Sequence, residues 1–344
     1  SVWLIIMSSI YELAHTDVSE RLGVPDLTLA GTLAALSLGL FAVGLALGLV
    51  WVVAIPRLCQ LFLRVDKAYP LYGVHYWLQQ VVSGTSNSQL YNLLFGDTSY
   101  IVNYLRWIGW DLGKVHQTGS NFGTNQRHDN PFLCRIGEGT MTSDGLSMMN
   151  TQMSSTVFRL KPATIGPACY LGNDIHFPPD ARAGANCLLG TKTLVPVDGP
   201  MRENVGLLGS PSFEIPRMVE RDRSMMGALD ETERLQRLSQ KNRHNIGTIA
   251  LFLITRWLFG CLSFFAVAVA IAGYTYIGIL APFLAALGML FCSIGYFAFI
   301  ERASLGFRRL KPGMFTIYDR HFWFHERHWK LSDSPIVGLF AGTP

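Results

Sequence analysis

The feature that most constrains this chain is a six-residue repeat between residues 165 and 195. An apolar side chain returns at every sixth position: Ile165, Leu171, Phe177, Ala183, Leu189 and Val195. A glycine or proline follows each of them: Gly166, Gly172, Pro178, Gly184, Gly190 and Pro196. A second, mostly small residue comes four positions after each: Cys169, Ile175, Ala181, Cys187, Thr193 and Gly199. The pattern predicts a triangular β-coil in which each hexad forms one face and its apolar side chain fills the narrow interior.

A weaker register of the same kind precedes this repeat, at Ile136, Thr142 and Met148. It is out of phase with the later register, so we expect a loop between about Asn150 and Thr164. An ordinary β-sandwich is the alternative that the same short apolar segments allow.

Two long stretches of the chain carry no Asp, Glu, Lys or Arg: residues 27–56 and 257–300. A helix needs about 20 apolar residues to cross about 30 Å of hydrocarbon. We therefore expect a transmembrane hairpin over residues 1–63, its first span truncated, and a second hairpin over residues 246–303. The second hairpin would break near residues 273–278, where two glycines flank a Tyr-Thr-Tyr-Ile sequence. Charged residues make up only 15% of the chain, against about a quarter in soluble proteins.

Basic residues flank the large middle region on both sides. They are Arg57, Arg64 and Lys67 before it, and Arg217, Arg221, Arg223, Arg237, Lys241 and Arg243 after it. The positive-inside rule places this region in the cytosol and the chain in the cell membrane as a multi-pass protein. The net charge of +4 is largely juxtamembrane. It therefore suits the lipid bilayer as a partner and calls for no nucleic acid.

The middle region divides into two predicted parts. Residues 64–217 are punctuated by Gly and Pro too often for long helices, so we expect a soluble domain there. Residues 218–245 are polar and helix-prone, and we expect them to form a connecting helix back to the bilayer.

A longer repeat relates the two halves of the chain. The sequence YGVHYW at residues 72–77 is similar to YDRHFW at residues 318–323, and LFGDT at 94–98 is similar to LFAGT at 339–343. Residues 304–344 are therefore predicted to begin a second, similar soluble domain.

The six cysteines are scattered, and none forms a CxxC pair. We expect reduced thiols in a cytosolic setting and no metal site.

Several segments together resemble one known family. They are residues 117–123 (QTGSNFG), 128–132 (HDNPF), 144–147 (DGLS), 165–167 (IGP), 171–173 (LGN), 207–217 (LLGSPSFEIPR) and 318–329. The chain resembles the C-terminal half of the membrane-bound nonribosomal peptide synthetases that make homopoly(amino acids), of the ε-poly-L-lysine synthetase type. The resemblance implies a multi-span α-helical membrane protein carrying a cytosolic left-handed parallel β-helix of the hexapeptide-repeat acyltransferase kind.

The resemblance also implies a reaction and its partners. An acyltransferase-type domain would form an amide (isopeptide) bond by transferring a carrier-bound aminoacyl thioester to an amine. The 4'-phosphopantetheine would sit on a carrier domain outside this chain, and ATP and magnesium would serve only an adenylation domain that is also outside it. The carrier and adenylation domains of the same synthetase are the expected partners, and we expect a homo-oligomer.

Aminolysis of a thioester needs a base for the amine proton and a donor for the developing oxyanion. His128, in a polar stretch before the Ile136 coil, is predicted to be this base on a projecting loop, with Asp129 orienting its imidazole or receiving the amine. A loop histidine that is hydrogen-bonded to backbone is the plain alternative.

Five further residues are predicted to bind substrate: Asn121, Asp144, Asn150, Asn173 and His176. Asp144 would receive a cationic amino acid, although a turn-capping aspartate is the ordinary explanation for it. His176 is an alternative base, against a simple place on the flank of a coil. Turn chemistry explains Asn121 equally well.

Two other functions stay open from the sequence. One is a free-standing membrane acyltransferase that uses a small acyl-CoA. The other is a non-catalytic scaffold domain for an active copy.

Overall fold

The structure is a computed structural model that describes residues 26–113, 122–220, 231–308, 313 and 319–332. It divides into two compact units, which we treat separately. The helical unit comprises the described residues within 1–47, 250–312 and 327–344. The coil unit comprises those within 48–249 and 313–326. The short first span predicted at the N-terminus lies outside the described residues.

Three helices are long and apolar enough to cross a membrane in the part of the chain that the structure describes. They lie in α3 (Asp26–Gln60), α8 (Glu231–Ile277) and α9 (Leu280–Ser304). The expected break between the last two falls at Gly278, whose φ of +57° is a backbone conformation that glycine adopts readily. The predicted connecting helix is not a separate element, because residues 231–245 run into the span without interruption as part of α8.

The helical unit is held partly by aromatic contacts between α8 and α9. Tyr296 donates its hydroxyl to the carbonyl of Thr255 at 2.7 Å, and the Phe259 and Phe297 rings lie 5.0 Å apart. The Arg256 guanidinium lies over the rings of Phe252 and Phe297. Such cation–π contacts help an arginine to lie within an apolar run.

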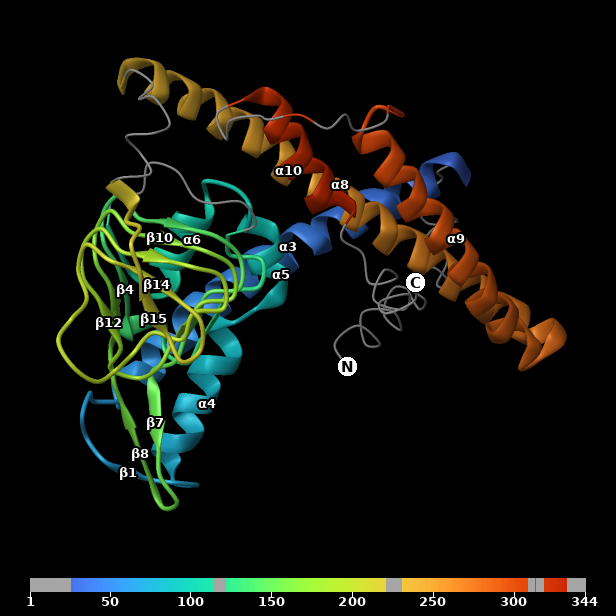
Figure 1. The fold of residues 1–344 in the computed structure, drawn as a ribbon. Coiled ribbons are helices and arrows are strands. Elements are labelled where there is room, and N and C mark those ends of the chain that lie inside the picture. The colour runs from blue at the N-terminus through green and yellow to red at the C-terminus, as the bar shows by residue number, and fades with distance from the viewer. Residues whose placement is uncertain (1–25, 114–121, 221–230, 309–312, 314–318, 333–344) are drawn as a thin grey trace. The chain divides into compact units, whose positions relative to one another are not determined.

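The coil unit begins with three short helices after α3: α4 (Val74–Ser86), α5 (Gln89–Phe95) and α6 (Ile101–Ile108). Strand β7 (Thr151–Met153) and strand β8 (Val157–Leu160) form an antiparallel hairpin. One core cluster joins the end of α3, α4 and β8 through Cys59, Leu63, Val82, Phe158 and Leu160. In Figure 1, α4 runs alongside the β7–β8 hairpin. At the other end of the chain, α10 (Arg320–Ser332) has 13 residues, as α4 has, and both helices start two residues after the tyrosine of the longer repeat.

Short strands then form three sheets built mainly of parallel pairs. The β12 sheet contains β2 (Asp111–Leu112), β4 (Cys134–Ile136), β9 (Ala163–Ile165) and β12 (Arg182–Ala183). The β11 sheet contains β3 (Arg127–His128), β6 (Ser147–Met148) and β11 (His176–Phe177). The β10 sheet contains β5 (Met141–Thr142), β10 (Tyr170–Leu171), β13 (Leu188–Leu189), β14 (Gly206–Leu208) and the antiparallel β15 (Phe213–Ile215).

From β9 to β13 the chain visits these sheets in rotation, one hexad to a sheet. Neighbouring strands therefore pair 18 residues apart, as at positions 165 and 183, 171 and 189, and 189 and 207. This parallel pairing is that of a three-sheet coil and not that of an ordinary sandwich. The left-handed sense of the winding stays a prediction.

The earlier register pairs with the later one 29 residues apart: 136 with 165, 142 with 171 and 148 with 177. The excess over one 18-residue turn is 29 − 18 = 11 residues, which accommodates the antiparallel hairpin of β7 (Thr151–Met153) and β8 (Val157–Leu160). Strand β8 also pairs with β1 (Tyr69–Pro70). The loop expected between about residues 150 and 164 is therefore this hairpin.

The interior of the coil is filled by the residues that the repeat indicated. All six apolar hexad residues are buried, with Leu171, Phe177 and Leu189 fully so. A Cβ at Gly166 would collide with the carbonyl carbon of Gly184 in the next turn, so the glycine is required by the close approach of two backbones.

The corners of the coil repeat as well. Ala168, Asp174, Asp180, Asn186 and Lys192 have φ between +55° and +69° and lie six residues apart. Asn and Asp tolerate this left-handed conformation better than most residues, which explains three of the five.

Candidate functional site

His128 lies in strand β3 and not on the projecting loop that the sequence predicted. Its neighbour Arg127 points outward, while the imidazole points inward and is only 3% exposed. Strand alternation puts consecutive side chains on opposite faces, and helix α4 covers the inner side of His128 through Ser86. The predicted position of His128 on a loop was therefore wrong. Its predicted role as a base stays a prediction, because the position of a residue does not test its role.

The hydrogen bonds around His128 fix its tautomer. Ser86 donates its hydroxyl proton to the carbonyl of Val82 at 2.6 Å, so His128 Nε2 must donate to Ser86 Oγ at 2.9 Å. Nδ1 then carries no proton, and it has no hydrogen-bond partner among the described residues. Burial lowers the pKa of His128 from 6.5 to about 3, so the imidazole is neutral at physiological pH. The indole of Trp110 stands perpendicular to it, with ring centroids 5.5 Å apart.

Asp129 and Asn150 hold the β7–β8 hairpin against the coil. Asp129 Oδ2 accepts from the amides of Asn150 and Thr151 at 2.9 and 3.0 Å. Asn150 is fully buried and donates to the carbonyls of Leu133 and Lys161, both at 3.2 Å. These bonds give both side chains a structural role, and Asn150 has no surface from which to reach a substrate.

Asp144 fixes the loop that precedes β3. It accepts from the Thr124 hydroxyl at 3.1 Å and from the amide and side chain of Asn125 at 3.2 and 2.8 Å. The geometry agrees with the capping explanation for this aspartate. Asn173 lies in the corner after β10, where its carbonyl accepts from the amide of Lys192 at 2.9 Å. Asn121 lies outside the described residues.

His176 is exposed, as was expected of His128, although it lies in strand β11 and not on a projecting loop. Its side chain is exposed on the outer face of the β11 sheet, while its amide and carbonyl pair with Thr193 and Val195 of the next turn. The register aligns His176 with Ser147 and with Arg127, and a further bridge aligns it with Leu194. Because neighbouring strands lie about 4.8 Å apart, these four residues form an outward row, which we name the β11 row.

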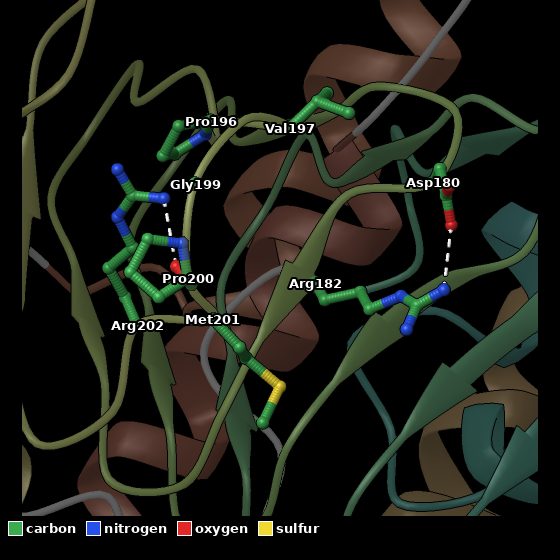
Figure 2. A pocket seen from close by; sticks show the side chains of 8 residues that line it. All are labelled: Asp180, Arg182, Pro196, Val197, Gly199, Pro200, Met201 and Arg202. Carbon is green, nitrogen blue, oxygen red and sulfur yellow. Dashed lines mark hydrogen bonds and ion pairs between the residues drawn. The ribbon is translucent and has the colours of Figure 1, made fainter.

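A pocket of about 210 Å³ lies at the corner that follows the β11 sheet, and Figure 2 shows its lining. The lining residues are Asp180, Arg182, Pro196, Val197, Gly199, Pro200, Met201 and Arg202. Asp180 pairs with Arg182 at 3.0 Å and with Lys161 at 3.9 Å. Arg202 donates from Nη1 to the carbonyls of Asp198 and Pro200 at 2.7 and 3.0 Å.

The pocket is close to the β11 row along the chain. Asp180 follows His176 by four residues, and Pro196 follows Leu194 by two. Both segments leave the same sheet and turn the same corner of the coil. The pocket and the exposed imidazole are thus on consecutive parts of one surface.

The predicted site residues do not gather in one place. His128 and His176 belong to the same sheet but to opposite faces of it, because His128 aligns with Met148 and Phe177 in the interior. Prediction missed Arg127, Ser147, Arg182 and Arg202. The repeat itself contained a signal for Arg182, since the residue before each apolar hexad position points outward.

No protein-family model matches the chain, and no curated protein matches it. Two solved structures match part of this chain. A maltose O-acetyltransferase from Clostridium difficile 630 is 16% identical with a TM-score of 0.30, over 43% of this chain and 91% of that chain. A galactoside acetyltransferase in complex with coenzyme A is 14% identical with a TM-score of 0.32, over 48% of this chain and 92% of that chain. At this level of similarity, neither structure assigns an activity to the present chain.

Proposed function

We propose that the coil unit is an acyltransferase that transfers an acyl group from a thioester to an amine, with His176 as the general base. The observation that carries the proposal is the exposed imidazole of His176, which is fixed on a parallel strand beside Ser147, with Arg127 one strand further along the same row. A base must reach the reacting amine, and His176 is exposed whereas His128 is covered.

The β11 row offers the groups that aminolysis requires. The amine nitrogen attacks the thioester carbonyl, and His176 takes the proton that the nitrogen loses. When the C–S bond breaks, the imidazolium returns this proton to the departing thiolate, so that the products are an amide and a thiol. The Arg127 guanidinium and the Ser147 hydroxyl are donors in the same row, and they would stabilise the oxyanion as it develops.

The donor substrate we propose is an aminoacyl thioester on the 4'-phosphopantetheine of a carrier domain, as the sequence resemblance implies. The pocket after the row supports this choice of donor, because its lining includes the guanidinium groups of Arg182 and Arg202, and guanidinium groups can bind a phosphate. Asp180 offsets part of this charge and offers a contact for an amino group. The product would be an amide of a homopoly(amino acid), joined through a side-chain amine.

The setting we propose is the cell membrane, with the coil unit on its cytosolic side. The three long apolar helices and the basic residues that flank the middle region support this topology. The carrier and adenylation domains of the same synthetase are the proposed partners. The homo-oligomer stays a prediction.

The experiment is an amide-formation assay on the full chain in nanodiscs, with an aminoacyl-pantetheine thioester and a free amino acid. We expect His176→Ala to slow amide formation by about 100-fold or more, since general-base catalysis contributes that much. Tyr170→Ala is the matched control, because Tyr170 is also an exposed strand residue of the coil but lies in the β10 sheet.

Three results would overturn parts of the proposal. A His176→Ala variant that forms amide as fast as the Tyr170→Ala control would remove the base. Turnover of acetyl-CoA and not of the aminoacyl thioester would replace the donor by a small acyl-CoA. A wild-type chain that forms no amide from either donor would favour the non-catalytic scaffold.

A further inference from the structure

Beyond Gly48, helix α3 has two different faces within the coil unit. One face packs on the unit's own residues and buries Val52, Pro56 and Cys59. Helix α5 comes so close at Gly48 that a Cβ there would collide with the hydroxyl of Tyr91. Helix α6 is joined to α3 nine residues later, where Arg57 donates to the carbonyl of Trp107 at 2.7 Å.

The opposite face of α3 is apolar and exposed. Val50, Trp51 and Leu58 are each more than half exposed on it. Leu90 of α5 and Trp107 of α6 are each 46% exposed. Their helices contact α3 at Gly48 and Arg57, and we name the five exposed apolar residues of these three helices the apolar face of the coil unit.

This face continues a stripe that begins earlier on the same helix. Leu47 follows Val43 by four residues, and Val50 follows Leu47 by three. These spacings keep the three side chains on one side of α3. Val43 and Leu47 are also more than half exposed, and they belong to the candidate span Ser37–Gln60. Val50, Trp51 and Leu58 lie in the same candidate span, so the coil unit's own part of α3 is apolar enough to lie in a membrane.

The length of α3 shows how deep the contact with α5 lies. Residues 27–56 carry no charge, and 30 helical residues measure about 45 Å, which exceeds the hydrocarbon thickness of about 30 Å. Arg57 is the first cation of the helix, and such a residue lies at headgroup level. Gly48 precedes Arg57 by nine residues, so in a helix that crosses the bilayer upright it would lie about 13 Å nearer to the bilayer centre.

We propose that the apolar face lies in the cytosolic leaflet, so that α5 and α6 are partly immersed beside the span instead of standing in water. Two tryptophans on the face suit the membrane interface. Arg57, Arg64 and Lys67 follow directly and suit anionic headgroups. The occupant of the face is the bilayer that α3 crosses, and the proposal is independent of any catalysis by the β11 row.

The test is spin-label accessibility on the full chain in nanodiscs of phosphatidylethanolamine and phosphatidylglycerol. Single labels are attached at Leu58→Cys, Leu90→Cys and Trp107→Cys. The background carries Cys261→Ala and Cys292→Ala, and the other four cysteines are kept because they are buried and should not react with the label. Leu287→Cys on α9 is the span control, and Leu208→Cys on β14 is the water control, with the two native residues 41% and 37% exposed. Collisions with oxygen report lipid, and collisions with a nickel chelate report water.

We expect the oxygen-to-nickel ratio at Leu58, Leu90 and Trp107 to exceed that at Leu208 by roughly fivefold and to approach that at Leu287. Ratios at Leu90 and Trp107 equal to that at Leu208 would show that α5 and α6 stand in water, and would overturn the proposal. Labels shielded from both reagents would show that a second copy covers the face, which would also overturn it. Because Leu90 and Trp107 lie on different helices, either label decides the test if the other substitution prevents folding.

Discussion

His128 and His176 show how one strand position decides what a histidine can do. Both residues are in the β11 sheet, yet one imidazole lies under helix α4 and the other is exposed. Desolvation keeps the buried ring of His128 neutral, and its Nε2 donates a hydrogen bond to Ser86 Oγ. Substitution of His128 should therefore change the stability of the fold, and substitution of His176 should change the rate of catalysis.

The pKa of His128 predicts a loss of stability at acidic pH. The unfolded state takes up a proton below pH 6.5, whereas the folded state resists until about pH 3. The contribution of the neutral imidazole is complete above pH 6.5 and is lost as the pH falls through this window. From about pH 7.5 to about pH 5 the free energy of unfolding should fall by about 2 kcal/mol on this account.

Urea titration of the coil unit within the full chain, followed by tryptophan fluorescence, measures this loss. In His128→Gln the fall between the two pH values should shrink by the same amount. An equal pH dependence in His128→Gln and wild type would show that the imidazole is not buried as described.

At the scale of the element, the coil depends on glycines where neighbouring turns meet. Gly166 faces the backbone of the next turn, where no Cβ fits. Gly84, in the exposed part of helix α4, has open space around its Cα. The same substitution should therefore have opposite effects at the two positions.

Gly166→Ala should lower the free energy of unfolding by about 1–3 kcal/mol, because the methyl group forces two turns apart. Gly84→Ala should raise it by about 0.5–1 kcal/mol, because alanine loses less backbone freedom in a helix. Urea titration of the two variants beside wild type measures both changes. If Gly166→Ala were as stable as wild type, the turns could not be packed as closely as the structure has them.

The elements also show which parts of the fold were predictable. The hexad positions predicted the buried interior, because a residue at Leu171 or Phe177 meets the same surroundings in every turn. The phase shift between the registers indicated an inserted loop, which the structure shows to be the β7–β8 hairpin. By contrast, nothing in the local pattern around His128 indicated that α4, about 40 residues earlier, would cover β3. Tertiary contacts of this kind have no period, so a polar stretch was mistaken for an open loop.

A similar limit applies to the site residues. Asp129 and Asp144 are the residue types that catalytic sites use, but the same oxygens also satisfy backbone amides at insertions and turns. Composition cannot separate the two uses, whereas the hydrogen bonds can. The repeat predicts the outward position of His176, because His176 comes directly before the apolar Phe177 and neighbouring strand residues point to opposite faces.

At the scale of the whole molecule, the chain combines three apolar helices with a coil whose outer surface carries the proposed chemistry. The proposed function gives the two histidines different roles: the inward His128 supports the fold, and the outward His176 would transfer the proton. This difference can be tested on the unmodified sequence, because the two imidazoles differ in their access to a reagent in solution.

The most direct measurement is carbethoxylation of the full chain by diethyl pyrocarbonate, with peptide mass spectrometry at both histidines and amide formation measured in parallel. We predict that His176 reacts first, that the aminoacyl thioester slows its modification, and that amide formation falls in proportion to modified His176 while His128 is still intact. Full activity after complete modification of His176, or a loss of activity that follows His128 instead, would contradict the account.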